Sequence, residues 1–344
     1  MSDFDSGLTL GTLLGSGYFG DVYDATDSLG EKVAVKLLRP TPGESSAAFK
    51  ARELGLLGEA ARLLDARHEN VVRIKDVVRH RPTGRVLLVA EFCSGGSLEA
   101  VYKAAPSPLR AVRDHSTQIA LGLQAIHSRG MLHRDIKPAN VLLGANGEAK
   151  LADFGLVTNK LILGYASDQG YLDHLAPEVY TAKVTSTKTD VWAFGMTVYR
   201  LLHGHTWYLE ATVANRPRTA IPKGGFARSL KWLPHIPDPW RRFVRKCMHD
   251  EPPHRYQGAE QLLEGLAGLP VEPEWSCSVT PGEVRWERPS KERVLHTIWT
   301  RLSPNRHTWL VESVGSKGTR VLRRPKKAVS RSQVERDLKA WFGA

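Results

Sequence analysis

The residues best suited to chemistry lie between His133 and Asn140 and in Asp153-Phe154-Gly155, which begins thirteen residues after Asn140. Within the first stretch, Asp135 precedes Asn140 by five residues. A carboxylate can orient the proton of an attacking hydroxyl, and carboxylate and amide oxygens are ligands that Mg²⁺ accepts in proteins. The spacing therefore predicts a phosphoryl-transfer site, where a nucleotide, its magnesium ions and a hydroxyl acceptor meet.

These residues resemble the catalytic loop and the Asp-Phe-Gly motif of the eukaryotic-type (Hanks-type) protein kinases. Lys137, two residues after Asp135, resembles the serine/threonine branch of that family. The resemblance implies that Asp135 accepts or orients the hydroxyl proton, while Lys137 neutralises charge on the transferred phosphoryl group. It also implies that Asn140 and Asp153 each hold a Mg²⁺ or Mn²⁺ ion. We expect His133 to be a packed, structural histidine.

A glycine-rich stretch and a lysine-bearing strand supply the expected nucleotide contacts. Gly15, Gly17 and Gly20 form a G-x-G-x-x-G pattern, which by itself also marks dinucleotide folds and ordinary turns. The following KVAVKLL, at residues 32–38, has the alternation of a strand and matches the family's V-A-I-K pattern. A lysine inside such an apolar strand is costly unless it is paired. Lys36 therefore predicts phosphates on one side and a carboxylate on the other.

The carboxylate that pairs with Lys36 is expected in a helix from about residue 47 to residue 64. Glu53 and Glu59 are the two candidates. Glu59 is preferred because it lies nine residues before His68, which begins a segment resembling the family's H-P-N-I-V. Glu53 lies six residues earlier and would not share a helical face with Glu59.

The strand ending in LLVAEFC resembles the family's fifth strand and hinge, so the backbones of Glu91 and Cys93 are expected to bind adenine. In that alignment Ala90 is the small gatekeeper residue beside the pocket. Cys93 is interpreted as a packed, unreactive thiol. The residues expected to contact ATP are Gly15, Gly17, Gly20, Val22, Ala34, Lys36, Glu91, Cys93 and Leu142.

An activation segment is expected from Asp153 to Glu178, with Arg134 available to pair with a phosphate placed on it. The family usually has a threonine where this chain has Tyr171, which leaves the acceptor preference open. Three hydroxyl residues are candidate phosphorylation sites, although each is more often an unmodified loop residue: Thr158, Tyr165 and Ser167.

Two further motifs support the resemblance, which covers residues 8 to about 269. Asp190 begins a D-x-W-x-x-G pattern whose aspartate braces the catalytic loop in the family, and Arg255 is expected to pair with Glu178. The implied fold class is α+β: a two-lobed protein-kinase fold (domain 1–269, lobes 1–92 and 93–269) with a small β-rich C-terminal extension at 270–344.

Composition restricts the class of protein. With 42% apolar residues, the 344-residue chain can bury a core. Three widely spaced cysteines give neither a disulfide framework nor metal-ligand spacing, and no apolar run is long enough for a membrane helix. We therefore expect a soluble, cytoplasmic protein without a membrane span.

The last fifth of the chain resembles no family that we can identify. Its residues 270–344 contain 15 Lys and Arg against 8 Asp and Glu, which favours acidic partners. Alternation predicts strands at 284–287, 294–302, 308–314 and 319–322, and a helix capped by Ser332 and Glu335 closes the chain. Trp286, Trp299 and Trp309 suit either base stacking or a core.

The leading hypothesis is an ATP-dependent serine/threonine protein kinase that phosphorylates proteins and itself. A pseudokinase or scaffold is the first alternative, disfavoured because Lys36, Asp135, Asn140 and Asp153 are all present. A small-molecule kinase is disfavoured by Arg134, Lys137 and the Ala176-Pro177-Glu178 ending. For the basic C-terminal domain, nucleic acid, an acidic protein or substrate docking, and a purely structural extension all stay open.

Overall fold

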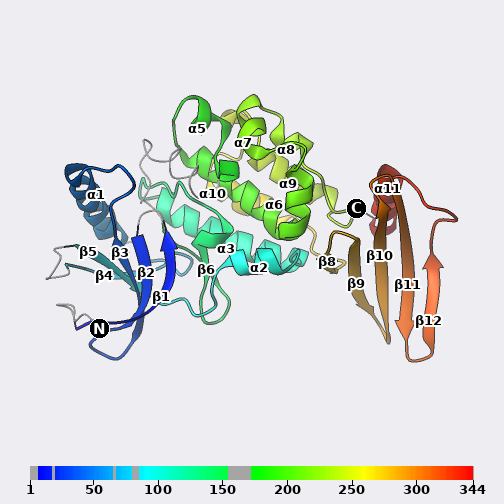
Figure 1. Ribbon diagram of the computed structural model, residues 1–344, viewed down its shortest axis with the longest axis horizontal. Coiled ribbons are helices and arrows are strands. Elements are labelled where there is room, and N and C mark those ends of the chain that lie inside the picture. Colours follow the sequence, from blue (N-terminus) through cyan, green and yellow to red (C-terminus); the bar gives the residue numbers. More distant parts are fainter. Residues whose placement is uncertain (1–6, 18–19, 65–66, 80–84, 154–171, 344) are drawn as a thin grey trace.

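The computed structural model describes residues 7–17, 20–64, 67–79, 85–153 and 172–343. Three parts follow one another along the long axis: a small lobe with a sheet and one helix, a larger helical lobe, and a C-terminal sheet with its own helix (Figure 1). Within the described residues, no helix is both long and apolar enough to cross a membrane.

The small lobe is a five-stranded antiparallel sheet with strand order β1-β2-β3-β5-β4. Period-two alternation places Val33, Val35, Leu87 and Val89 on one face, where they form a small core of their own. The helix α1 runs alongside this sheet (Figure 1). The elements are β1 (Thr9–Gly17), β2 (Gly20–Thr26), β3 (Lys32–Leu38), α1 (Ser46–Leu64), β4 (Ile74–Arg79) and β5 (Val86–Glu91).

The large lobe is built around α6, whose residues are buried on nearly every side. A helix that is apolar all round belongs in a core, so the amphipathic α3 and α9 pack beside it. Its elements are α2 (Leu98–Ala104), α3 (Leu109–His127), β6 (Val141–Leu143), β7 (Ala149–Leu151), α5 (Pro177–Thr181), α6 (Thr187–Thr212), α7 (Pro217–Ala220), α8 (Phe226–Ser229), α9 (Asp238–Cys247) and α10 (Ala259–Ala267).

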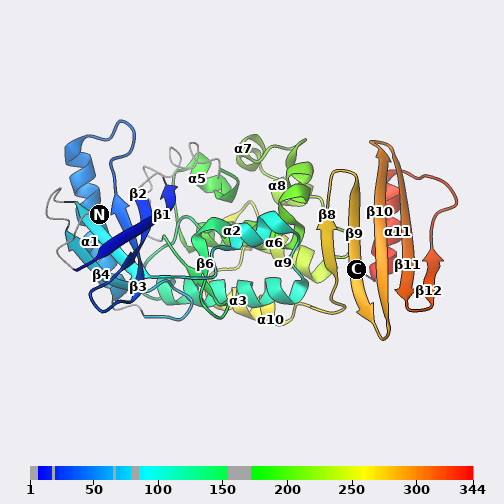
Figure 2. The ribbon, with the colours of Figure 1, turned by 60° about the horizontal axis from the view of Figure 1, so that its bottom comes forward.

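The C-terminal part is a five-stranded antiparallel sheet of order β12-β11-β10-β9-β8, with one helix against a face (Figure 2). Its elements are β8 (Ser276–Val279), β9 (Glu283–Ser290), β10 (Arg293–Ser303), β11 (Arg306–Gly315), β12 (Gly318–Arg323) and α11 (Arg331–Phe342). The β8 strand was not predicted. The predicted cap was wrong by two residues, because Ser330 caps α11 by accepting the N–H of Gln333.

The C-terminal sheet shares a core with the large lobe. The Trp299 ring lies edge-on to Trp207, with 6.2 Å between the ring centroids, and the Trp286 indole donates to Nδ1 of His235 at 2.8 Å. Trp309 is buried as well. Trp286, Trp299 and Trp309 are therefore core residues, and they are not free to stack on nucleic-acid bases.

Candidate active site

The side chains of the predicted catalytic loop converge on Asp135. The Lys137 ammonium lies 2.9 Å from Asp135 Oδ2, and the Asn140 amide donates to the same oxygen at 2.7 Å and to the Asp135 carbonyl at 2.9 Å. All three residues come from one turn after α3, closed by a 3-10 helix at Pro138–Asn140. This geometry holds one carboxylate in a fixed orientation with a cation beside it.

Asp190 fixes the backbone of this loop through hydrogen bonds. Its carboxylate accepts the N–H groups of His133 at 2.9 Å and Arg134 at 2.8 Å, and it also contacts Nε2 of His127. Burial alone would raise the pKa of Asp190, but these partners, led by His127, hold it below its usual value. Arg134 has a φ of 68°, a left-handed conformation that the Asp190 contact stabilises.

His133 has the structural role that its sequence context indicates. Its ring is fully buried, and its Nδ1 accepts the Asp135 N–H at 3.3 Å. Burial lowers the pKa of His133 despite the nearby Asp190 and Asp135, so the ring stays neutral at physiological pH. A neutral histidine with this contact orients the loop and carries no charge into the site.

Lys36 is paired with Asp153, which was predicted as a metal ligand. The Lys36 ammonium lies 2.7 Å from Asp153 Oδ1. Burial would raise the pKa of Asp153, but the charges of Lys36 and Lys137 keep it below its usual value. Glu59 lies in α1, but its side chain is outside the described residues. The alternative Glu53 is buried, and its carboxylate accepts the Val86 N–H at 3.2 Å.

Asn140 and Asp153 fit the divalent ion that the resemblance implies. The Ala152 N–H donates to the Asn140 carbonyl at 2.9 Å, which brings the two candidate ligands together. The Asn140 amide nitrogen is used by Asp135, so its side-chain oxygen is the atom suited to a cation. Among the described residues no group of three or more His, Cys, Asp or Glu forms a metal cage. Mg²⁺ suits such a sparse donor set because phosphates and water complete its coordination.

A cleft of about 500 Å³ lies between the lobes and reaches Asp153. Most of the predicted nucleotide contacts line it: Gly15, Val22, Ala34, Lys36, Glu91, Cys93 and Leu142. Gly17 and Gly20 belong to the strands that cover it but are not among its lining residues. A mostly apolar cleft that also contains a lysine and a carboxylate suits a ligand with a flat ring and a charged tail, such as a nucleotide.

The three predicted glycines differ in what requires them. A Cβ on Gly20 would lie 2.2 Å from the Leu37 carbonyl oxygen, so the pairing of β2 with β3 requires this glycine. A Cβ on Gly15 would meet nothing within 4 Å, and one on Gly17 would make only ordinary contact. Their open surroundings leave room for phosphate oxygens to approach the backbone. Arg39 donates to the Gly17 carbonyl at 2.8 Å, which ties the end of β1 to the residue after β3.

The hinge residues have additional contacts. Glu91 donates its N–H to the Arg73 carbonyl at 2.9 Å. We therefore expect the Glu91 carbonyl oxygen to be the atom that accepts a hydrogen bond from adenine. Burial, with the charge of Glu91, raises the pKa of the Cys93 thiol to about 11. A thiol with that pKa is almost entirely protonated at neutral pH, which agrees with an unreactive Cys93.

The sequence analysis did not predict several apolar residues that line the cleft, among them Leu14, Val72, Ile74 and Leu88. A signal for Leu88 was present, because it lies two residues before Ala90 in β5 and so faces the same side. Leu14 and Val72 lack such a signal, since the fold alone brings them to the cleft.

Ala90 lines the cleft, so its size should control access to the space behind the nucleotide. Replacing Ala90 with phenylalanine should weaken ATP-competitive inhibitors that carry a bulky group at this point by at least tenfold, because the ring would fill that space. Inhibition curves for the wild type and the variant measure the effect, with a small inhibitor lacking the group as control. Equal inhibition of both proteins would show that Ala90 is not the gatekeeper.

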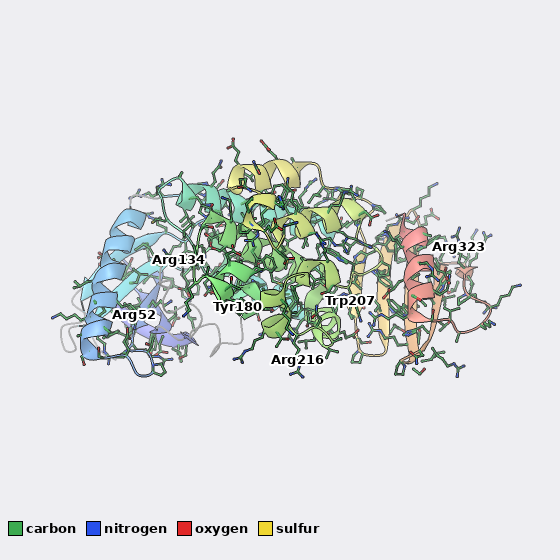
Figure 3. All side chains as sticks on the ribbon, turned by 90° about the horizontal axis from the view of Figure 1, so that it is seen from above. Arg52, Arg134, Tyr180, Trp207, Arg216 and Arg323 are labelled. Carbon is green, nitrogen blue, oxygen red and sulfur yellow. The ribbon has the colours of Figure 1, made fainter. Side chains whose placement is uncertain are left out.

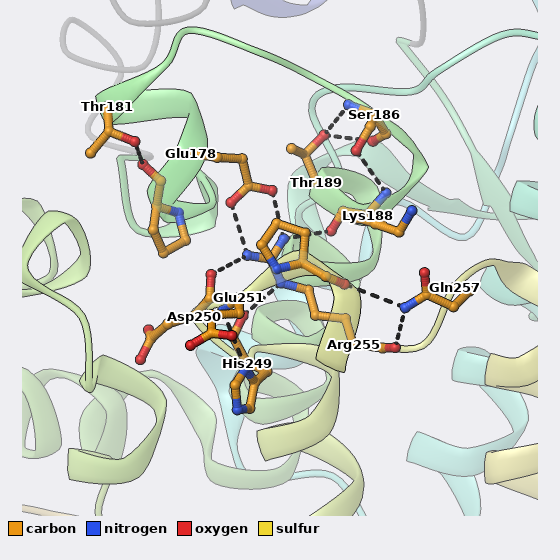
Figure 4. Close-up of polar contacts among 12 residues, drawn as sticks. Glu178, Thr181, Ser186, Lys188, Thr189, His249, Asp250, Glu251, Arg255 and Gln257 are labelled. Carbon is orange, nitrogen blue, oxygen red and sulfur yellow. Dashed lines mark hydrogen bonds and ion pairs between the residues drawn. The ribbon is translucent and has the colours of Figure 1, made fainter.

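The predicted pair between Arg255 and Glu178 is confirmed. Two guanidinium nitrogens donate to the two carboxylate oxygens at 2.7 and 2.8 Å (Figure 4). The remaining N–H groups donate to three backbone carbonyl oxygens, those of Lys188, His249 and Asp250. Arg255 thus ties the end of the activation segment to α6 and to the turn after α9.

The remaining predictions on this segment fall on residues 154–171, outside the described residues. They concern Tyr171 and the candidate phosphorylation sites Thr158, Tyr165 and Ser167. Arg134, expected to pair with a phosphate on the segment, lies near the border between the two lobes (Figure 3).

Comparisons with known proteins agree with this site. A family model described as the protein kinase domain matches residues 8–265. Mitogen-activated protein kinase kinase kinase 3 of Arabidopsis thaliana is 32% identical over 259 residues, which cover 73% of this chain and 44% of the relative. Cytokinesis protein sepH of Aspergillus terreus is 32% identical over 264 residues, covering 74% of this chain and 18% of the relative. The chain therefore spans less than half the length of these curated relatives, and the family model ends before β8.

Proposed function

The chain belongs to the protein kinase family, and we propose that it transfers the γ-phosphate of ATP to serine and threonine hydroxyls of proteins, including its own. The observation that carries this proposal is the cluster of Asp135, Lys137 and Asn140, with contacts of 2.7 to 2.9 Å. The Asn140 carbonyl accepts the N–H of Ala152, which lines a cleft together with Lys36 and Asp153.

Each of these residues has a definite part in the proposed reaction. The Asp135 carboxylate orients the acceptor hydroxyl and receives its proton as the oxygen attacks the γ-phosphorus, whose bond to the bridging oxygen breaks to release ADP. Lys137, which lies beside Asp135, stabilises the negative charge on the phosphoryl group during its transfer. Lys36 holds the phosphates of ATP. A divalent ion on Asn140 and Asp153 would neutralise charge on those phosphates, and we propose Mg²⁺ or Mn²⁺ for this part.

Protein substrates and a serine/threonine preference are proposed from the family and from Lys137. Relatives named mitogen-activated protein kinase kinase kinases support a protein acceptor. The assembled set of Lys36, Asp135, Asn140 and Asp153 argues against a pseudokinase that only binds partners. We also propose a cytoplasmic location, which the free thiols of the three cysteines support.

Phosphate transfer from labelled ATP tests the proposed function. The protein should incorporate label with Mg²⁺, and the label should be recovered as phosphoserine or phosphothreonine. Lys36→Met should lower incorporation by at least tenfold, because it removes the cation from the phosphate end of the cleft. Lys32→Met, on the same strand but exposed, is the matched control and should retain activity.

Two outcomes would contradict the proposal. Label found only on tyrosine would exclude the serine/threonine assignment. ATP binding by the wild type without any transfer to itself, to casein or to basic protein would favour the scaffold hypothesis.

A further inference from the structure

The outer edge of the C-terminal sheet is open. The edge strand β12 pairs with β11 on one side, and no other described strand pairs with it (Figure 1). All six of its residues are exposed, including Val321 at 49% and Leu322 at 39%. An open edge of this kind offers backbone N–H and C=O groups to a further strand.

The register of the hairpin identifies the backbone groups that face outward. Gly315 pairs with Gly318 across the two-residue turn, so these two form the hydrogen-bonded pair that closes the hairpin. Thr319, opposite Val314, and Val321, opposite Glu312, then occupy non-hydrogen-bonded positions. In an antiparallel pair such residues turn their N–H and C=O groups away from the partner strand. The outer edge therefore presents the N–H and C=O groups of Thr319 and Val321.

The side chains of β12 divide between the two faces of the sheet. Arg323 pairs with the buried Val311, and its guanidinium lies over the Trp341 ring of α11 at 5.3 Å. Arg320 pairs with Ser313 and shares this face. Val321 lies on the opposite face. Figure 3 shows Arg323 at the far end of the molecule, beside α11.

The charge around this edge is predominantly positive, and Glu312 of β11, opposite Val321 on the face away from α11, is the acidic residue beside it. Between Glu312 and Glu335 the sequence has no acidic residue, while it has seven basic ones: Lys317, Arg320, Arg323, Arg324, Lys326, Lys327 and Arg331. Among the described residues, the one ion pair found for this group joins Arg331 to Glu335. The other cations of the unit that contact the large lobe are neutralised, as in the pairs of Arg301 with Glu210 and Lys339 with Asp238. Most basic residues on and just after β12 thus have no acidic partner among the described residues.

The open strand edge and the positive charge together favour one kind of partner. Two copies of the same edge would bring like charges together, which disfavours self-association. Nucleic acid would gain phosphate contacts, but the three buried tryptophans of the sheet offer it no stacking surface. An extended peptide gains both backbone hydrogen bonds and charge pairing.

We propose that β12 binds an extended, acidic segment of a partner protein as an additional strand of the C-terminal sheet. Acidic side chains of that segment face Arg320 and Arg323 on the α11 side, and β-branched or apolar side chains lie beside Val321 on the other face. The edge is at the opposite end of the molecule from the small lobe (Figure 1). The partner therefore docks without covering the cleft, and docking is independent of phosphoryl transfer.

The test uses the full chain and a fluorescein-labelled peptide of alternating glutamate and valine, followed by fluorescence anisotropy. Val321→Pro should weaken binding at least tenfold, because proline removes the outward N–H and its ring blocks the approach of a strand. That N–H is not used by β11, so the hairpin itself should persist. Val321→Thr keeps the N–H and is the matched control, and thermal melting of both variants checks the fold.

The charge requirement is tested separately. Arg320→Glu with Arg323→Glu should also weaken binding at least tenfold, and a lysine and valine peptide should not bind. Asp135→Asn should bind the peptide as the wild type does, so failure of docking is distinguishable from failure of catalysis. Val321→Pro binding like the wild type would overturn strand addition, as would no peptide binding by the wild type. Tighter binding of a single-stranded oligonucleotide than of the peptide would assign the edge to nucleic acid instead.

Discussion

Replacing Asp135 with asparagine should lower the rate of phosphoryl transfer by about 10²–10⁴-fold, the range expected for loss of a positioned general base. Asparagine keeps the size of the side chain and can still accept the Asn140 amide hydrogen bond. It cannot receive the hydroxyl proton, and it leaves the Lys137 ammonium without its carboxylate. The measurement is the initial rate of label transfer from ATP at saturating nucleotide.

The control for this variant is Asp114→Asn, a carboxylate exposed on α3 away from the cleft, which should leave the rate unchanged. Nucleotide affinity should also be unchanged in Asp135→Asn, because Asp135 is not among the residues that line the cleft. A variant that retains more than about a tenth of the wild-type rate would contradict the role of Asp135 as the base.

Replacing Arg255 with methionine should lower the free energy of unfolding by about 3–5 kcal/mol, the cost of removing one partner from a buried ion pair. The Arg255 side chain is fully buried, and all five of its N–H groups are used, two on Glu178 and three on backbone carbonyls. Methionine fills much of the same space. The lost free energy of unfolding therefore comes mainly from the polar groups left without partners, and less from a cavity. Urea unfolding followed by circular dichroism measures it.

Two further variants separate the causes. Arg242→Met changes an exposed arginine on α9 and should alter the free energy of unfolding by less than about 0.5 kcal/mol. Adding Glu178→Leu to Arg255→Met removes the stranded carboxylate and should recover part of the loss. An Arg255→Met protein as stable as the wild type would mean that this pair does not hold the end of the activation segment in place.

The position of the site could be predicted because its residues are close in the sequence. Asp135, Lys137 and Asn140 lie within one turn, so their spacing nearly determines their geometry. The glycine-rich turn and β3 were similarly predictable, since alternation and turn residues are local signals. The catalytic loop and the covering strands could therefore be inferred from local signals, whereas the two-lobed fold was implied by the resemblance to the protein kinases.

Contacts across the chain could not be predicted in this way. In the structure Lys36 contacts Asp153, 117 residues away, and no local pattern in the sequence indicates that contact. Glu59, the predicted partner, has its side chain outside the described residues and stays a prediction. Ser330 rather than Ser332 caps α11. The pairing of Val329 with His307 fixes the chain immediately before Ser330, so that Ser330 stands at the start of the helix. In each case the deciding contact joins segments whose separation leaves no periodic signal.

The C-terminal sheet shows the same division. The sequence alone determined four of its strands, its helix and its excess of basic residues, because alternation and charge are visible in the residues themselves, but it did not determine β8. Only the tertiary structure decided that Trp286 and Trp299 pack against the large lobe and that β12 is an open edge of the sheet. The physical reason is that burial and strand order depend on which distant surfaces pack together, and a residue's neighbours along the chain do not specify that packing.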